Sequence, residues 1–231
     1  MLALFYQIFT FANVTFMLKG LAMSVAIAVL ATVISMFFGT ILALIRTYAN
    51  GAFQWASALV AVYTEFFRCT PNLLWILWIY FTIKGNKIAV SVFAISLFTS
   101  AVMAEIFRGG LNSIPKGQSE AAASQGFSYL ETMYYIILPQ TIRIIMPPLA
   151  NQALNLVKNT SILAMVAGMD LMYYTDSWGA DRGYFAQAYF TSALLYFIIC
   201  FPLARLGRYL EIRSMRLPAP KKIVIKEDGL C

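Results

Sequence analysis

Residues 21–45 form a run of 25 residues without a single charged side chain. As a helix rising about 1.5 Å per residue, this run would be about 38 Å long, more than the roughly 30 Å hydrocarbon core of a bilayer. The whole chain is 61% hydrophobic and only 12% charged, whereas soluble domains are about 45 to 50% apolar and about 25% charged. The chain is therefore predicted to be an integral membrane protein, which excludes a soluble enzyme.

Residue types that carry chemistry are scarce. Histidine is absent, and the three cysteines, Cys69, Cys200 and Cys231, lie far apart. Because histidine is the commonest metal ligand and the usual base of nucleophilic triads, we expect no metal site, no disulfide scaffold and no cofactor. No glycine-rich loop ends in Gly-Lys-Ser or Gly-Lys-Thr, so nucleotide binding of the P-loop kind is not expected either. The sequence predicts a protein without a catalytic site.

Five apolar segments are candidates for membrane-spanning helices, which predicts an all-α integral membrane fold. They are residues 21–45, 53–83, 88–104, 144–169 and 185–204. Residues 1–17 are apolar, but they are interrupted by Gln7 and Asn13 and lack the pattern of a signal peptide. We expect an interfacial segment at residues 1–17, a transmembrane domain at 18–213 and a basic cytoplasmic tail at 214–231.

Lysine and arginine are divided unequally between the two sides of these segments. With the N-terminus outside, one side carries 11 basic residues and the other 4, and Arg68 and Lys158 within the segments complete the 17. Cytoplasmic loops are enriched in lysine and arginine. Residues 111–138 and the C-terminus are therefore predicted to be cytoplasmic, and residues 170–184 to lie outside.

The second segment, residues 53–83, is too long for one upright helix and carries its own break. Glu65 and Arg68 are three residues apart and hence on one face of a helix, and Thr70 and Pro71 follow directly. Pro71 cannot donate to the preceding turn. Two interpretations remain open. The pair is either a structural ion pair at the cytoplasmic interface or part of a gate on a broken helix, as in transporters generally.

Polar residues of the fourth segment recur on one helix face. Asn151, Asn155, Lys158 and Asn159 fall within an arc of about 100° at 3.6 residues per turn. Hydrogen bonds between helices would explain the asparagines, but they give the lysine no partner. A charge within a span is costly and is a functional candidate by default. Lys158 is therefore predicted to meet an anionic group of a passing solute.

The cytoplasmic segment contains a specific motif. Glu120-Ala121-Ala122 is followed by Gly126 and then by Ile137-Leu138-Pro139. This pattern resembles the EAA loop of permeases from ATP-binding-cassette (ABC) importers, here at about residues 111–139. Three further stretches resemble the polar amino acid branch of that family, the histidine, glutamine, glutamate and arginine permeases. They are residues 67–71, residues 105–118 and Lys158-Asn159-Thr160-Ser161.

The resemblance implies a type I ABC importer permease fold with five transmembrane helices and a cytoplasmic EAA coupling loop. It also implies cytoplasmic ATPase subunits, an extracytoplasmic binding protein and a second permease subunit, in a bacterial cytoplasmic (inner) membrane. Glu120 to Gln125 is a strong helix former, and Gly126 is its predicted C-terminal cap. The resemblance implies that Glu120, Ala121, Ala122 and Gly126 transmit movement from the ATPase.

The predicted substrate is a polar amino acid held by Lys158, Asn155, Asn159, Asn151, Thr160 and Ser161. No carboxylate lies on that stripe, so glutamine, glutamate or aspartate is favoured over arginine or lysine. An ATP-independent transporter or channel is the alternative, but it would need a coupling carboxylate or an inverted repeat, which the sequence does not offer. A membrane scaffold would have no use for Lys158. The basic tail lacks aromatic residues for base stacking, so nucleic acid is not an expected partner.

Overall fold

The structure, a computed structural model, describes residues 11–49 and 51–215, and every regular element in these ranges is helical. The all-α prediction is therefore confirmed. The elements are α2 (Phe11–Tyr48), η1 (Gly51–Phe53), α3 (Gln54–Cys69), α4 (Asn72–Thr82), α5 (Lys87–Asn112), α6 (Lys116–Ser124), α7 (Tyr129–Glu131), the π-helical η2 (Thr132–Ile137), α8 (Leu138–Asn159), η3 (Thr160–Val166), α9 (Leu171–Arg182) and α10 (Phe185–Met215). The predicted basic tail lies outside the described residues from residue 216 on.

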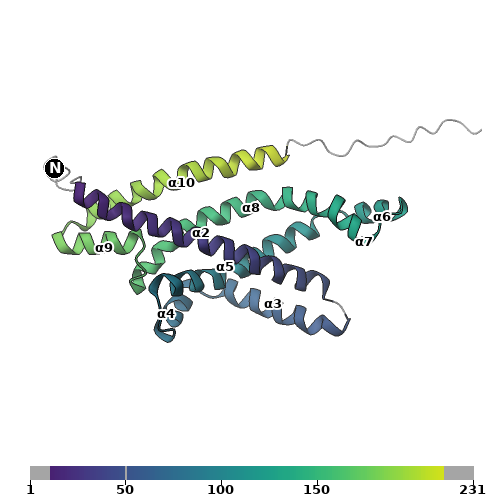
Figure 1. Cartoon of the computed structure of the whole chain (residues 1–231), viewed down its shortest axis with the longest axis horizontal. Coiled ribbons are helices and arrows are strands. Elements are labelled where there is room, and N and C mark those ends of the chain that lie inside the picture. The colour runs from purple at the N-terminus through teal and green to yellow at the C-terminus, as the bar shows by residue number, and fades with distance from the viewer. Residues whose placement is uncertain (1–10, 50, 216–231) are drawn as a thin grey trace, which may run out of the picture.

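The long helices run along the long axis of the molecule (Figure 1). The short helix α9 lies at the end where α2 begins, and α6 and α7 lie at the opposite end. These two regions belong to the connections that the sequence assigns to opposite sides of the membrane. The fold therefore separates them by the length of the helices.

Helices α2 and α5 pack against each other more extensively than any other two elements of the described chain, and they form the centre of the core. Ile27 and Ala31 of α2 and Ile95 of α5 are fully buried, and Leu156 and Leu163 join the same apolar cluster from α8 and η3. Burial of each such side chain stabilises the fold by roughly 1.5 to 3 kcal/mol in water. Within a bilayer, close packing of these side chains supplies the stability instead.

The N-terminal part of α2 is continuous with the first predicted span. The helix begins at Phe11 and passes residue 17 without a break. Met17 is 2% exposed and packs in a cluster with Leu171 and Trp178 of α9. The structure thus joins residues 11–17 to the helix that follows them. Their position at a membrane interface stays a prediction.

Within the described part of the chain, three helices are long and apolar enough to cross a membrane by length and composition, namely Asn13–Tyr48, Lys87–Asn112 and Phe185–Arg213. They include the first, third and fifth predicted spans. The second predicted span is divided between α3 and α4, and the fourth between α8 and η3. The total of five spans therefore stays a prediction, because these two are not single long helices.

The break in the second segment lies at the predicted position. Helix α3 ends at Cys69, Thr70 is extended, and Pro71 precedes α4. A residue before proline is driven out of the helical region, and the proline has no N–H to continue the ladder. Thr70 Oγ1 donates to the carbonyl of Phe66 (2.7 Å) and accepts from Trp75 Nε1 (2.7 Å). One hydroxyl therefore connects the two helices across the break.

Gly109 and Gly110 directly follow one another after the third predicted segment, and α5 continues through both of them to Asn112. A Cβ on Gly110 would collide with the side chain of Ile145, whereas one on Gly109 would meet nothing. Gly110 therefore lets α8 approach α5 closely.

A proline ordinarily ends a helix, so the sequence predicts that Pro139 closes the helical cytoplasmic segment, and this prediction is wrong. Helix continues from Tyr129 to Asn159, with the π-helical η2 directly before Pro139, which is near the start of α8. A proline removes one hydrogen bond and crowds the carbonyl four residues earlier. The wider π turn gives the chain another bonding pattern at this point, so the helix continues.

The fourth segment changes its helix type after Asn159. Residues 160–166 form the 3₁₀ helix η3, and Ala167 (φ 53°) and Met169 (φ 60°) then have left-handed backbones. Asp170 begins α9, and Gly183 (φ 71°) ends it. Lys158 consequently lies in the last turn of α8, although the sequence placed it in the middle of a long helix.

Candidate functional site

The polar stripe of the fourth segment is present on α8. Asn151, Asn155 and Lys158 are exposed and Asn159 is half-buried, on a helix whose Leu156 and Val157 are buried in the core. The apolar face of α8 thus faces the protein, and the polar face is left open in the single chain. This is the arrangement of a helix that faces a partner subunit or a water-filled path.

Lys158 occupies a favourable position for a cation. It lies in the last turn of α8, where the carbonyl ends of the helix carry partial negative charge. None of the ion pairs among the described residues involves it. The helix end lowers the cost of the charge, but it leaves the ammonium group without a carboxylate.

An open groove of about 510 Å³ lies between α8 and α10, and Lys158 is part of its wall. Its lining consists of Leu154, Lys158, Ser161, Ala193, Tyr196, Phe197, Cys200, Phe201 and Ala204. Lys158 is the one charged side chain in this set. Ligand pockets have volumes of about 300 to 1,000 Å³ and pair apolar walls with a few polar groups. The groove therefore has the size and character of a site for a small anionic or zwitterionic ligand.

Thr160 and Ser161 are placed differently from each other. Ser161 lines the groove, whereas Thr160 is fully buried and its hydroxyl donates to the carbonyl of Val157 (2.8 Å). The structure therefore directs the Thr160 side chain into the protein, away from the groove. Its hydroxyl helps to end α8.

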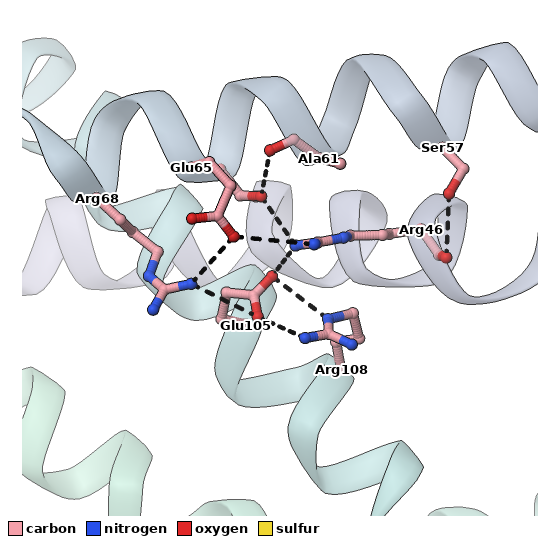
Figure 2. A network of polar contacts seen from close by, with 8 residues as sticks. Arg46, Ser57, Ala61, Glu65, Arg68, Glu105 and Arg108 are labelled. Carbon is pink, nitrogen blue, oxygen red and sulfur yellow. Dashed lines mark hydrogen bonds and ion pairs between the residues drawn. The ribbon is translucent and has the colours of Figure 1, made fainter.

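A second cluster of charges joins α2, α3 and α5 (Figure 2). Glu105 lies at its centre, where Arg46 contacts Oε1 and Arg108 Nη2 donates to Oε2 at 2.8 Å. Arg68 Nη1 lies 3.7 Å from Glu105 Oε2 and 3.8 Å from Glu65 Oε1. Three guanidinium groups thus surround two carboxylates.

The members of this cluster differ in their exposure to solvent. The side chains of Glu105 and Arg46 are 17% and 19% exposed, whereas those of Glu65 and Arg68 are 57% and 42% exposed. Arg46 Nη1 also donates to the buried hydroxyl of Thr64 (2.9 Å). The Glu65–Arg68 pair is therefore the outer edge of a larger network centred on Glu105.

Helix α6, which carries the EAA motif, ends in a hydrogen-bonded cap. The N–H of Gly126 donates to Ala123 O (3.0 Å), and the N–H of Phe127 donates to Ala122 O (3.1 Å). This pair of bonds is a Schellman motif, and Gly126 (φ 85°) supplies its left-handed residue. Gly126 closes α6 as predicted. Glu120 and Ala121 are exposed and Ala122 is buried, so α6 presents a small-residue surface.

The turn after α6 is held by a capping box. Ser128 N donates to Glu131 Oε2 (2.8 Å), and Glu131 N donates to Ser128 Oγ (3.3 Å). Ser128 Oγ also donates to Glu131 Oε2 (2.7 Å), and this bond together with the one from Ser128 N stabilises the charged carboxylate and lowers the pKa of Glu131. Local hydrogen bonds therefore hold the turn between α6 and α7.

Asp170 is a buried carboxylate in the connection between η3 and α9. Its side chain caps α9 by accepting from Met172 N (2.9 Å) and Tyr173 N (3.3 Å). Burial raises the pKa of Asp170 to about 6, although these two backbone hydrogen bonds oppose the shift. The sequence predicts only that residues 170–184 lie outside, because it does not reveal which carboxylate of such a connection becomes buried.

Three features of the site were missed from the sequence. Glu105 and Arg108 have the same i, i+3 spacing as Glu65 and Arg68, and this spacing could have identified them as a pair. Arg46 joins them only through tertiary packing. The α10 wall of the groove carries no charge and had no signal in the sequence.

Comparison with known proteins agrees with this architecture. Residues 35–216 match the family described as "Binding-protein-dependent transport system inner membrane component". The "Probable glutamine ABC transporter permease protein GlnM" of Bacillus subtilis is 39% identical over 208 residues, covering 88% of this chain and 95% of its own length. The "Glutamate/aspartate import permease protein GltK" of Escherichia coli O157:H7 is 29% identical, covering 87% of this chain and 95% of its own.

Solved structures show the same fold. The "Crystal structure of an amino acid ABC transporter with histidines" contains a chain that is 28% identical, with a TM-score of 0.81, covering 87% of this chain and 95% of that one. A chain of the MetNI methionine ABC transporter, 15% identical with a TM-score of 0.72, covers 90% of this chain and all of its own, and supports the fold alone.

A chain of apolar helices with an open polar stripe and a capped EAA helix defines a transport subunit of the membrane. The chain belongs to the binding-protein-dependent transport system inner membrane component family. It is a multi-pass permease subunit of an amino acid ABC importer.

Proposed function

We propose that this permease moves a polar amino acid, with glutamine, glutamate or aspartate favoured over arginine or lysine. The observation that carries the proposal is Lys158, a cation in a groove lined by no carboxylate. The α-carboxylate of the substrate would be its partner, in a charge-assisted hydrogen bond. A cationic side chain would find no opposite charge on this lining.

The names of the relatives support the same substrate class without deciding it. GlnM and GlnP of Bacillus subtilis, 39% and 35% identical, are named as probable glutamine permeases. ArtQ of the same organism, 29% identical, is named as an arginine transport permease. For the substrate class, the positive charge of Lys158 in the groove is therefore a stronger argument than the names of the relatives.

The polar stripe would extend the site beyond the groove, because the three asparagines are not among the residues that line it. Asn155 and Asn159 lie on the same face of α8 as Lys158, with Asn151 one turn earlier. Amide side chains both donate and accept hydrogen bonds, so they suit the amide of glutamine or the second carboxylate of glutamate.

The proposed partners follow from the two ends of the molecule. Cytoplasmic ATPase subunits would bind α6 through Glu120, Ala121, Ala122 and Gly126 and would supply the energy, because this chain is proposed to have no catalytic site. An extracytoplasmic binding protein would deliver the amino acid at the α9 end. A second permease subunit, either an identical chain or a sibling, would complete the pore. The N-terminus would lie outside and the C-terminus in the cytoplasm.

Two roles are proposed for the remaining predicted residues. Arg68 would tie the broken helix to Glu105, Glu65 would hold Arg68 and Arg46, and Thr70 and Pro71 would provide the point at which the helix bends. Opening of the long 3.7 Å contact between Arg68 and Glu105 would remove this ion pair between α3 and α5 at low cost.

Substrate-stimulated ATP hydrolysis in proteoliposomes tests the substrate class. We expect stimulation by glutamine, glutamate or aspartate, and little by arginine or lysine. Asn159→Asp adds the missing negative charge beside Lys158 and should shift the preference towards arginine by about tenfold, equivalent to about 1.4 kcal/mol. Equal stimulation by arginine and glutamine in the unaltered protein would contradict the proposal.

A further inference from the structure

The groove beside Lys158 presents one unresolved problem of charge. An α-amino acid carries a carboxylate and an ammonium group, and Lys158 can serve only the first. The nine lining residues include no aspartate or glutamate. An ammonium group in this groove must therefore be stabilised by something other than an ion pair.

The opposite wall of the groove is aromatic. Tyr196, Phe197 and Phe201 of α10 line it, facing the α8 wall that carries Lys158. A cation within about 6 Å of an aromatic ring is attracted to the ring face, and the attraction grows when water is excluded. The α10 wall can thus stabilise a cation without carrying a negative charge.

The same helix already shows this interaction at one end of the groove. Arg205 Cζ lies 5.2 Å from the centroid of the Phe201 ring, and Ala204 beside Arg205 lines the groove. Phe201 is therefore occupied by a cation from its own helix. Tyr196 and Phe197 are the rings that remain.

These two rings are suitably placed. Phe197 is 60% exposed in the single chain, and its ring is 5.2 Å from that of Phe201, so the two rings form one tilted surface. The hydroxyl of Tyr196 is buried, so the lining of the groove uses the ring of Tyr196 and not its polar end.

We infer that the α10 wall is the ammonium subsite of the groove, in which Tyr196 and Phe197 hold the α-ammonium group of the amino acid whose carboxylate meets Lys158. This inference rests on the proposed function and adds the residues that distinguish an α-amino acid from an acid without the amino group. The occupant is a free zwitterionic amino acid. Charge complementarity selects it, because the groove offers a cation on one wall and aromatic faces on the other.

Ala193→Cys gives a direct probe, because Ala193 is exposed and lines the same groove, whereas the native Cys200 is buried. In a Cys69→Ser, Cys200→Ala, Cys231→Ser background, a small methanethiosulfonate reagent would modify the introduced thiol, and a bound ligand should slow the reaction. The assay uses the detergent-solubilised permease–ATPase complex without the binding protein. The two ligands are glutamine and glutaramate, which is glutamine with hydrogen in place of the α-amino group.

Phe197→Leu keeps an apolar side chain and removes the aromatic face. We expect the half-protecting concentration of glutamine to rise about 2- to 30-fold, as loss of a cation–π contact would cause, while that of glutaramate stays unchanged. Phe197→Trp and Tyr196→Phe keep a ring and should preserve the preference for glutamine. Phe190→Leu is the matched control, because Phe190 is an exposed ring of α10 outside the groove lining.

The outcomes separate this inference from the proposed function. An equal rise for both ligands in Phe197→Leu would overturn the ammonium subsite, because the ring would then act only through its shape. If Lys158→Met weakens protection by both ligands in the same assay, the proposed contact between Lys158 and the substrate carboxylate stands even when the ammonium subsite is overturned. Protection by vesicles of anionic lipid but by neither ligand would overturn both and identify the groove as a lipid site.

Discussion

Two regions of this permease hold charges among apolar helices, and they hold them in opposite ways. In the network around Glu105, each charged group lies within 4.0 Å of an opposite charge, and the partners come from α2, α3 and α5. In the groove, Lys158 faces α10 without an ion pair among the described residues.

The difference distinguishes charges that hold the helices together from a charge that could bind the transported solute. A charge near the membrane costs several kcal/mol unless it is paired or hydrated, so a network of paired charges can join helices. A single unpaired cation contributes little to folding and is free to receive a ligand. Removal of a paired charge should therefore destabilise the folded protein, whereas removal of the unpaired charge should weaken ligand binding and leave folding intact.

The largest expected effect belongs to the centre of the network. Glu105→Gln leaves three guanidinium groups facing Glu65 alone, and loss of one partner from a largely buried ionic group costs on the order of 3 kcal/mol or more. The yield of folded complex and its Tm in detergent should both fall sharply.

Glu65→Gln is the matched control, because the Glu65 side chain is 57% exposed and its contacts are 3.8 and 4.0 Å long. An exposed pair of this kind is worth about 1 kcal/mol at most. Equal losses in both variants would show that Glu105 is not the centre.

A change on α6 should disable transport without disturbing either region. Ala121 is exposed, and a charge placed on it would be desolvated when the ATPase binds. Ala121→Asp should therefore abolish substrate-stimulated ATP hydrolysis in proteoliposomes while the yield and the affinity of the groove for glutamine persist. Full stimulation in this variant would contradict the coupling role of α6.

The smallest expected effect is the pH response of Asp170. Because burial raises its folded pKa to about 6 from 3.8, the folded state binds the proton more tightly than the unfolded chain does. Its contribution to stability is therefore largest below the unfolded value and declines as the pH rises through about 6. Asp170→Asn keeps the helix cap but removes the titration.

Acidification from pH 7.5 to 5 should stabilise the unaltered protein by about 1 kcal/mol relative to Asp170→Asn, which corresponds to about 2 to 4 °C in Tm. Paired melting curves at the two pH values provide the measurement. An identical pH response in the two proteins would assign the effect to groups other than Asp170.

Much of the fold could be predicted from local signals. The charge-free run predicted α2, the Thr70-Pro71 pair predicted the break between α3 and α4, and the position of Gly126 predicted the end of α6. The signals at Thr70-Pro71 and at Gly126 act within a few residues, through steric exclusion, a missing N–H or a left-handed backbone, and tertiary packing does not override them.

The remaining features depend on contacts between distant segments. Lys158 was placed within a long helix because no glycine or proline marks the change to η3 after Asn159. Arg46 and Glu105 are 59 residues apart, so their contact exists only once α2 packs on α5. The aromatic wall of the groove was predicted only as part of an apolar span, because a side chain that faces lipid and one that faces a groove look alike in sequence.

The affinity of the Lys158→Met complex for glutamine tests the contrast between the two regions most directly. Methionine keeps the volume and removes the charge-assisted contact, which is worth roughly 1.5 to 3 kcal/mol, or about 10-fold to 150-fold in affinity. Equilibrium binding and detergent-stable yield would be measured on the same preparations, together with assembly with the ATPase. The predicted result is a glutamine affinity that falls within this range while yield and assembly persist. An unchanged affinity with a reduced yield would contradict the account and make Lys158 a structural cation like the arginines around Glu105.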